Sequence, residues 1–129
     1  MIKGFEEYTI EISKEDFPKV NRIVFGLSHK IGKVNAVTNS YMRKALATNF
    51  SMNIGDAEMR KLIQYIRQNN LVPRLCSNSS GYYVAADDAE WLEWTESYRS
   101  RINSMIYTIK CSIQGENVLN FDPNSIHKI

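Results

Sequence analysis

The sequence is poor in the residues that build metal sites, disulfide frameworks and hydrolytic centres. Its 129 residues include two cysteines and two histidines, and Cys76 and Cys111 form neither a disulfide framework nor a CxxC-type zinc motif. Neither His29 nor His127 stands in a metal-ligand pair or beside a nucleophile, and no glycine-rich phosphate loop is present. We therefore expect no enzymatic activity, no metal and no cofactor.

Long hydrophobic runs are also lacking. No stretch approaches the roughly 18 consecutive apolar residues of a membrane-spanning helix, and the N-terminus, MIKGFEEYTIEI, lacks the basic and then apolar layout of a signal peptide. Hydrophobic residues make up 43% and charged residues 23% of the chain, which is ordinary for a soluble globular domain. The sequence predicts a cytoplasmic protein with no membrane partner.

Positive charge is present but unevenly distributed. The formal net charge is +2, yet residues 17–76 carry ten lysines and arginines against two acidic residues. Residues 1–16 and 77–96 are each net negative. A positive field concentrated in one part of a chain favours binding to a polyanion such as nucleic acid.

The stretch 55–85 predicts a helix followed by a β-hairpin. In GDAEMRKLIQYIRQN (55–69), apolar residues recur at the α-helical period, and Gly55 is placed to serve as N-cap. LVPRLCS and YYVA then flank the turn NSSG (78–81), the pattern of a hairpin. The apolar arc of the helix is Met59, Leu62, Ile63 and Ile66, and the solvent arc is Ala57, Arg60, Lys61, Gln64, Tyr65 and Gln68.

A helix with one apolar arc and one cationic, amide-rich arc has the donors that duplex DNA requires. Arginine and lysine bind phosphates or guanine, and glutamine pairs with adenine in the major groove. The same pattern also fits a solvated amphipathic helix beside an ordinary hairpin, so that alternative stays open. The residues expected to contact DNA, on this helix, the preceding helix and the hairpin, are Arg43, Lys44, Ala57, Arg60, Lys61, Gln64, Gln68, Arg74, Asn78, Ser79 and Ser80.

The surrounding elements predict an α+β, mainly α fold. A short helix, a tight connector and a second helix with a basic face make a helix-turn-helix, and with the hairpin residues 13–86 predict a winged helix-turn-helix domain. The first helix is expected to bury an apolar face made of Phe17, Val20, Ile23, Val24, Leu27 and Ile31. The elements expected before residue 55 are an N-terminal strand or arm over 1–12, a helix from Ser13 or Asp16 to about Lys30, a strand over 33–37 that pairs with the hairpin, and a helix over 40–47 capped by Thr38.

Residues 87–113 predict a long C-terminal helix. Asp87 and Glu90 form a D-x-x-E capping box, and an apolar stripe with aromatics in its first half follows. This stripe packs on the domain or pairs with its own copy in a homodimer, and both alternatives stay open. Residues 114–129 contain Gly, Pro and Asn without a period, and we expect a tail.

Several residues also match a known pattern. These are Arg60, Lys61, Ile63, Tyr65, Ile66 and Arg67 in the helix, and Pro73, Leu75, Cys76, Ser77, Gly81, Tyr82 and Tyr83 in the hairpin. The chain over roughly residues 33–113 resembles small phage and prophage winged helix-turn-helix DNA-binding proteins, and it departs from them in the 1–12 element and in Val72 and Arg74. The resemblance implies double-stranded DNA binding in a bacterial host cell, in phage DNA replication or early-gene transcription control.

A second hypothesis assigns the chain to a different class. A winged helix can serve as a protein-interaction module, such as a phage adaptor or an inhibitor of a host replication or transcription protein. The modest net charge of +2 and the acidic band at residues 87–96 favour this alternative. Its partner would be a host or phage replication protein, and Arg60 and Lys61 would be dispensable.

Overall fold

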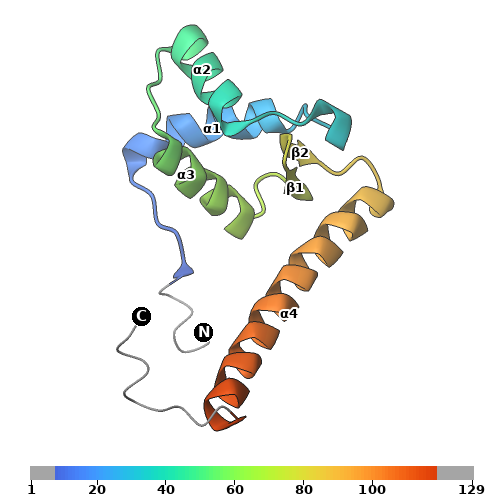
Figure 1. Ribbon diagram of the computed structural model, residues 1–129. Coiled ribbons are helices and arrows are strands. Elements are labelled where there is room, and N and C mark those ends of the chain that lie inside the picture. Colours follow the sequence, from blue (N-terminus) through green and yellow to red (C-terminus); the bar gives the residue numbers. More distant parts are fainter. Residues whose placement is uncertain (1–7, 119–129) are drawn as a thin grey trace. The chain divides into compact units, whose positions relative to one another are not determined.

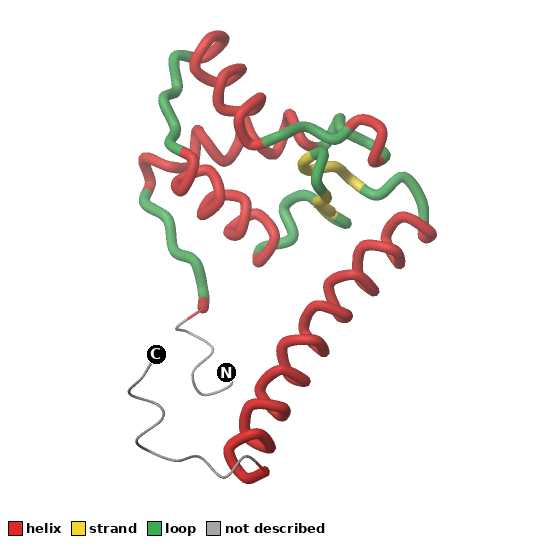
Figure 2. The backbone as a smooth tube through the Cα atoms, in the orientation of Figure 1, coloured by secondary structure: helices red, strands yellow, loops and turns green. Residues whose placement is uncertain are grey.

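The computed structural model describes residues 8–118, with side chains as far as residue 113. The described part is α+β and mainly helical, as predicted, with four α-helices and one two-stranded antiparallel sheet (Figure 1, Figure 2). The chain divides after Leu92 into two compact units. The elements are α1 (Phe17–Leu27), α2 (Asn39–Phe50), α3 (Asp56–Gln68), β1 (Leu75–Asn78), β2 (Gly81–Val84) and α4 (Asp88–Val118).

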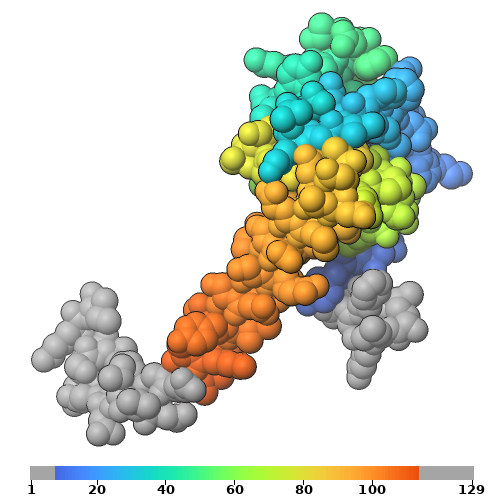
Figure 3. Space-filling view, turned by 90° about the vertical axis from the view of Figure 1, so that its right-hand side faces the viewer, coloured from blue at the N-terminus to red at the C-terminus, as the bar shows by residue number. Residues whose placement is uncertain are grey.

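The core of the first unit is built from the apolar faces of α1, α2 and α3. Met59 and Ile66 of α3 are completely buried, as their helical period predicts. On the face shown in Figure 3, α1, α2, α3 and the hairpin of the first unit form one continuous surface. The residues of this core are Val20, Ile23, Leu27, Met42, Leu46, Ile54, Met59, Leu62, Ile63, Ile66, Val72 and Leu75.

Two apolar residues assigned to the core by the period of the first helix lie on the surface instead. Phe17 is 45% and Ile31 is 54% exposed. Phe17 is the first residue of α1, where no preceding α-helical turn continues the packed face. Ile31 lies beyond the helix, because α1 ends at Leu27 rather than at the predicted Lys30. Phe17 is therefore exposed at the first turn of the helix, and Ile31 is exposed because the helical period does not continue past Leu27.

Helix α2 begins where predicted and continues further. The Thr38 side-chain oxygen accepts a hydrogen bond from the N–H three residues on at 3.0 Å, which is an N-cap. The helix ends at Phe50 rather than at residue 47. Ser51 then adopts a left-handed conformation with a φ of 54°, a common way for a helix to end.

Residues 8–12 form an arm, and no strand is found in this described part of the predicted N-terminal element. The backbone of the arm takes its partners from a side chain rather than from a neighbouring strand. The side-chain amide of Gln68 accepts from the Ile10 N–H at 2.8 Å and donates to the Tyr8 carbonyl at 2.7 Å. Residues 1–7 lie outside the described residues.

The predicted hairpin is confirmed. Strands β1 and β2 pair antiparallel from Leu75 opposite Val84 to Asn78 opposite Gly81. Two residues, Ser79 and Ser80, connect them, and the Asn78 side-chain oxygen accepts the Ser80 N–H at 2.8 Å. Such a side-chain bond to the backbone two residues on stabilises a tight turn.

The strand predicted over 33–37 is wrong as a continuous element. Residues Lys33–Asn35 form a 3-10 turn, and Gly32, with a φ of 88°, redirects the chain in a way that favours glycine. Single bridges flank the turn, from Ile31 to Val84 and from Val37 to Tyr82. The predicted pairing with the hairpin is therefore confirmed at Val37 only, and the bridge at Ile31 lies before the predicted range.

Helix α4 begins with the predicted capping interaction. The Glu90 N–H donates to the Asp87 carboxylate at 2.9 Å, while the Glu90 carboxylate accepts from the Ala86 N–H at 3.0 Å. The helix continues to Val118, so residues 114–118, predicted as tail, are helical. The rest of the predicted tail, 119–129, lies outside the described residues.

Substitution of Gly81 by alanine is expected to destabilise the fold strongly. Gly81 has a φ of 120°, and a Cβ atom there would overlap the Val37 carbonyl group. The backbone cannot retreat, because Val37 and Tyr82 exchange two hydrogen bonds at 2.9 and 2.7 Å. We expect the free energy of unfolding to fall by about 2–4 kcal/mol in urea denaturation.

The matched control is Gly26→Ala, because no atom lies within 4 Å of the position that a Cβ would take in that α1 residue. Alanine is the better helix former, so the control should be as stable as the wild type or slightly more so. Equal stability of Gly81→Ala and the wild type would contradict the tight approach of β2 to Val37.

Candidate nucleic-acid interface

The solvent face of α3 carries the basic and amide residues that its period places there. Ala57, Arg60, Lys61 and Gln64 are all exposed. Arg60 Nη2 lies 2.7 Å from Asp56 Oδ2, but the Arg60 side chain is 64% exposed. A solvent-screened pair of this kind contributes little to stability, so a phosphate can compete with Asp56 for the guanidinium group.

Helix α2 places two further cations beside the beginning of α3. Arg43 and Lys44 line an open depression together with Gly55, the N-cap of α3. Arg43 Nε donates to the Asn39 side-chain oxygen at 2.6 Å, and the Asn39 amide donates to the Asp56 carbonyl at 3.4 Å. The structure therefore brings Arg43 and Lys44 to the first turn of α3, the positive end of its helix dipole.

Gln68 stands apart from the other predicted contacts on α3. It lies one turn beyond Gln64 on the exposed side of the helix. Its amide, however, bonds to the backbone of Tyr8 and Ile10 in the arm. Gln68 thus fastens the arm to the end of α3, a role that the sequence period does not indicate.

Arg74 and the turn 78–80 lie at opposite ends of β1. Arg74 has a left-handed φ of 57°, and its Nη2 lies 2.7 Å from a carboxylate oxygen of Asp88, the first residue of α4. Asn78, Ser79 and Ser80 are exposed at the hairpin tip. The hairpin therefore presents the predicted tip residues to solvent but pairs Arg74 with the start of α4.

Arg67 links α3 to the hairpin, which sequence reasoning missed. Its Nη2 donates to the Ser77 hydroxyl at 3.2 Å, and its guanidinium carbon lies 5.9 Å from the Tyr82 ring centroid. The sequence marks this cation only as part of the positive field and of the family pattern. Arg67 directly follows the buried residue Ile66, and this position is the one local sign that its side chain packs within the protein.

A second missed link joins α1 to α3. Lys19 Nζ lies 2.7 Å from Glu58 Oε1, with the two side chains 26% and 35% exposed. The hydrogen bond to Glu58 is the main cause that raises the pKa of Lys19 above its ordinary value of 10.5, and nearby acidic charges add to it. The negative charge of Glu58 at the start of α3 is therefore paired with Lys19.

In the part of the chain that the structure describes, no group of three or more His, Cys, Asp and Glu side chains that could hold a metal ion is found. Burial raises the pKa of the Cys76 thiol, which keeps it protonated and unreactive. Among the described helices, none has both the length and the hydrophobicity needed to cross a membrane.

Comparison of the chain with protein-family models, with curated proteins and with solved structures gives no match. Its function is therefore inferred from the residues and the geometry described above.

The ion pair of Lys19 and Glu58 is expected to contribute stability that depends on pH. Because the folded protein raises the pKa of Lys19, this contribution is fully present below the ordinary value of 10.5 and is lost as the pH rises through the higher folded value. A double-mutant cycle with Lys19→Met and Glu58→Gln should give a coupling energy of about 0.5–1 kcal/mol near neutral pH. The coupling should be smaller at about pH 11.

Lys30→Met serves as control, since Lys30 follows the opposite end of α1 from Lys19 and makes no ion pair with any described residue. A cycle of Lys30→Met with Glu58→Gln should show no coupling at either pH. A Lys19–Glu58 coupling that stayed constant up to high pH would contradict the ion pair.

Proposed function

We propose that this protein is a non-enzymatic winged helix-turn-helix DNA-binding protein of the phage and prophage type, which acts in phage DNA replication or early-gene transcription control. In this proposal α3 is the recognition helix and enters the major groove, α2 approaches the DNA backbone, and the β1–β2 hairpin is the wing. The order of the elements and the bridges from the hairpin to Ile31 and Val37 support this arrangement. The phage setting rests on the resemblance of the helix and hairpin residues.

The observation that carries the proposal is a set of cations on two adjoining helices, of which Lys44, Arg60 and Lys61 are exposed and Arg43 is half-buried. Arg43 and Lys44 adjoin the first turn of α3, and Arg60 and Lys61 follow on its exposed face. Lys44 and Lys61 make no ion pair with any described residue, so their charges are available to phosphates. Gln64, one turn beyond Arg60, supplies an amide that can pair with adenine.

Gln68 and Arg74 have a secondary part in the proposal. Each has a partner within the protein, the arm backbone for Gln68 and Asp88 for Arg74. DNA contact by either residue requires exchange of that partner for a base or a phosphate. We therefore assign the main contacts to the α2 and α3 cations, to Gln64 and to the hairpin tip.

Loss of two α3 cations is expected to weaken DNA binding and its salt dependence together. Each phosphate contact contributes about 0.9 to the slope of log affinity against log salt concentration. For Arg60→Ala combined with Lys61→Ala, we expect a slope smaller by about 1–2 and binding at least about tenfold weaker at low salt. Fluorescence anisotropy of a labelled generic duplex at several salt concentrations measures both quantities.

The matched control combines Lys14→Ala with Lys110→Ala, which removes the same net charge from two exposed residues outside α2, α3 and the hairpin. This control should bind DNA like the wild type. An equal loss in both double variants would show that only the overall charge matters. Absence of binding by the wild type at low salt would overturn the proposal.

A second candidate function, the protein-interaction module, is favoured by α4. Six apolar side chains of this helix lie within an arc of about 100° and are each 45–62% exposed. A helix with such a face is stabilised mainly when the face packs against another element. This supports association with a second polypeptide, which is either a second copy in a homodimer or a host or phage replication protein. The six residues are Tyr98, Ile102, Met105, Ile106, Ile109 and Ile113.

Charge placed on this stripe is expected to abolish a homodimer. The variant Ile102→Glu combined with Ile109→Glu should remain monomeric in analytical ultracentrifugation at concentrations where the wild type dimerises. Tyr107→Glu is the control, because Tyr107 is 69% exposed and lies about 140° around the helix from Ile102. A wild type that is monomeric at every concentration would exclude the homodimer and direct attention to a different protein partner.

A further inference from the structure

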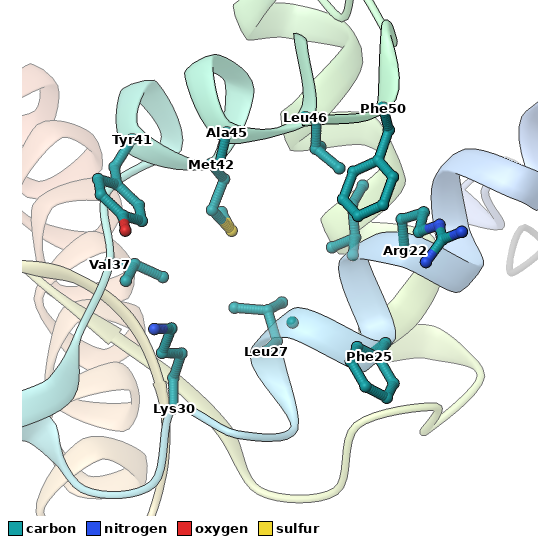
Figure 4. A pocket seen from close by; sticks show the side chains of 12 residues that line it. Arg22, Phe25, Leu27, Lys30, Val37, Tyr41, Met42, Ala45, Leu46 and Phe50 are labelled. Atoms are coloured by element: carbon teal, nitrogen blue, oxygen red, sulfur yellow. The ribbon is translucent and has the colours of Figure 1, made fainter. Parts of the chain in front are cut away.

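A cavity of about 230 Å³ lies between α1 and α2. Figure 4 shows Met42 reaching from α2 into the space above Leu27 on α1, with Val37 on one side and Leu46 on the other. Ala45 completes the α2 wall, and its short side chain leaves the space open. The lining is therefore mainly apolar, and five of its residues belong to the core or pack against it: Ile23, Leu27, Val37, Met42 and Leu46.

Two cations and a phenol stand at the edge of this cavity. Arg22 and Lys30 lie on opposite sides of it, and Tyr41 lies on the same side as Lys30 (Figure 4). The Arg22 guanidinium is stacked over the Phe50 ring, 4.2 Å from its centroid. Neither Arg22 nor Lys30 makes an ion pair with any described residue, but the Arg22 guanidinium is held against Phe50 whereas the Lys30 ammonium has no side-chain partner among the described residues. The Lys30 ammonium group is therefore the charge that a ligand can meet.

The rim of the cavity is aromatic and exposed. Phe25, Tyr41 and Phe50 are 67%, 59% and 44% exposed, and apolar groups gathered around a concavity are typical of a binding surface. An apolar cavity of about 150 Å³ accommodates benzene. A cavity of about 230 Å³ thus has room for one ring with a short side chain, which is smaller than a peptide helix.

We propose that this cavity binds a small carboxylate with an apolar body, such as an arylalkanoate. The ring would lie against Met42, Leu27 and Ala45, and the carboxylate would bind the Lys30 ammonium and accept a hydrogen bond from the Tyr41 hydroxyl. An apolar body alone would leave Lys30 without a counter-charge, and a free anion alone would leave the apolar walls exposed to water. The proposal does not depend on DNA binding, because none of the lining residues is among the proposed DNA contacts.

Two probes of equal size and shape test the charge requirement. The wild-type protein is titrated with 3-phenylpropanoate and with the neutral 3-phenylpropanamide, and binding is followed by the Met42 methyl chemical shift in NMR spectra. We expect saturable shifts for the carboxylate with a dissociation constant at or below about 1 mM. The amide should bind about tenfold more weakly, because it lacks the ionic partner for Lys30.

Two variants locate the site. Lys30→Gln should remove the tenfold preference for the carboxylate, whereas Lys14→Gln, with the same charge change at an exposed residue outside the cavity, should retain it. Ala45→Leu should abolish binding of both probes by filling the space, with unfolding in urea as the check that the variant folds.

Three outcomes would overturn the proposal. The first is equal affinity of the wild type for the two probes, which would make the cavity a nonselective apolar site. The second is an equal loss in Lys30→Gln and Lys14→Gln, which would reduce the effect to net charge. The third is the absence of a saturable change in the Met42 methyl chemical shift with either probe. In that case the cavity would be a site for side chains of a second copy or of another protein.

Discussion

Burial of one stripe of α3 is the constraint on which the first unit depends. Met59 and Ile66 are completely buried and Leu62 is 1% exposed, so α3 contributes side chains to the core along its whole length. Rotating this helix would expose several large apolar side chains, each worth about 1.5–3 kcal/mol when buried. The same constraint fixes which side chains face water. Arg60, Lys61 and Gln64 face solvent because the apolar residues beside them on the helix must stay buried.

The periods and caps in the sequence were sufficient to predict the main elements. Thr38 caps α2, Asp87 starts α4, and the turn 78–81 closes the hairpin, because each signal acts over three or four residues. The side-chain contacts that sequence reasoning missed have partners distant in sequence. The bonds of Gln68 to the arm and of Lys19 to Glu58 join residues far apart in sequence, and periodicity predicts the face of a side chain but not the group that it meets.

Polar residues of α3 divide into two sets with different tasks. At the end of the helix, Arg67 holds the hairpin and Gln68 holds the arm. Earlier in the helix, Arg60 and Lys61 face solvent without a strong partner within the protein. Because of this division, the proposed DNA contacts lie on the first three turns of α3, next to the α2 cations. Helix α2 in turn has a second side, which forms one wall of the cavity.

The hydrogen bonds from Gln68 to the arm determine the fraction of molecules in which the arm is released. Two hydrogen bonds at the surface together contribute about 1–3 kcal/mol, so the molecule with the arm released is populated at about 1–15%. Only that minority has the Gln68 amide available to another group. For any ligand that uses this amide, the apparent association constant is therefore the intrinsic one multiplied by that fraction. Removal of the arm residues up to Ile10 would raise the affinity for such a ligand, although these residues make no contact with it.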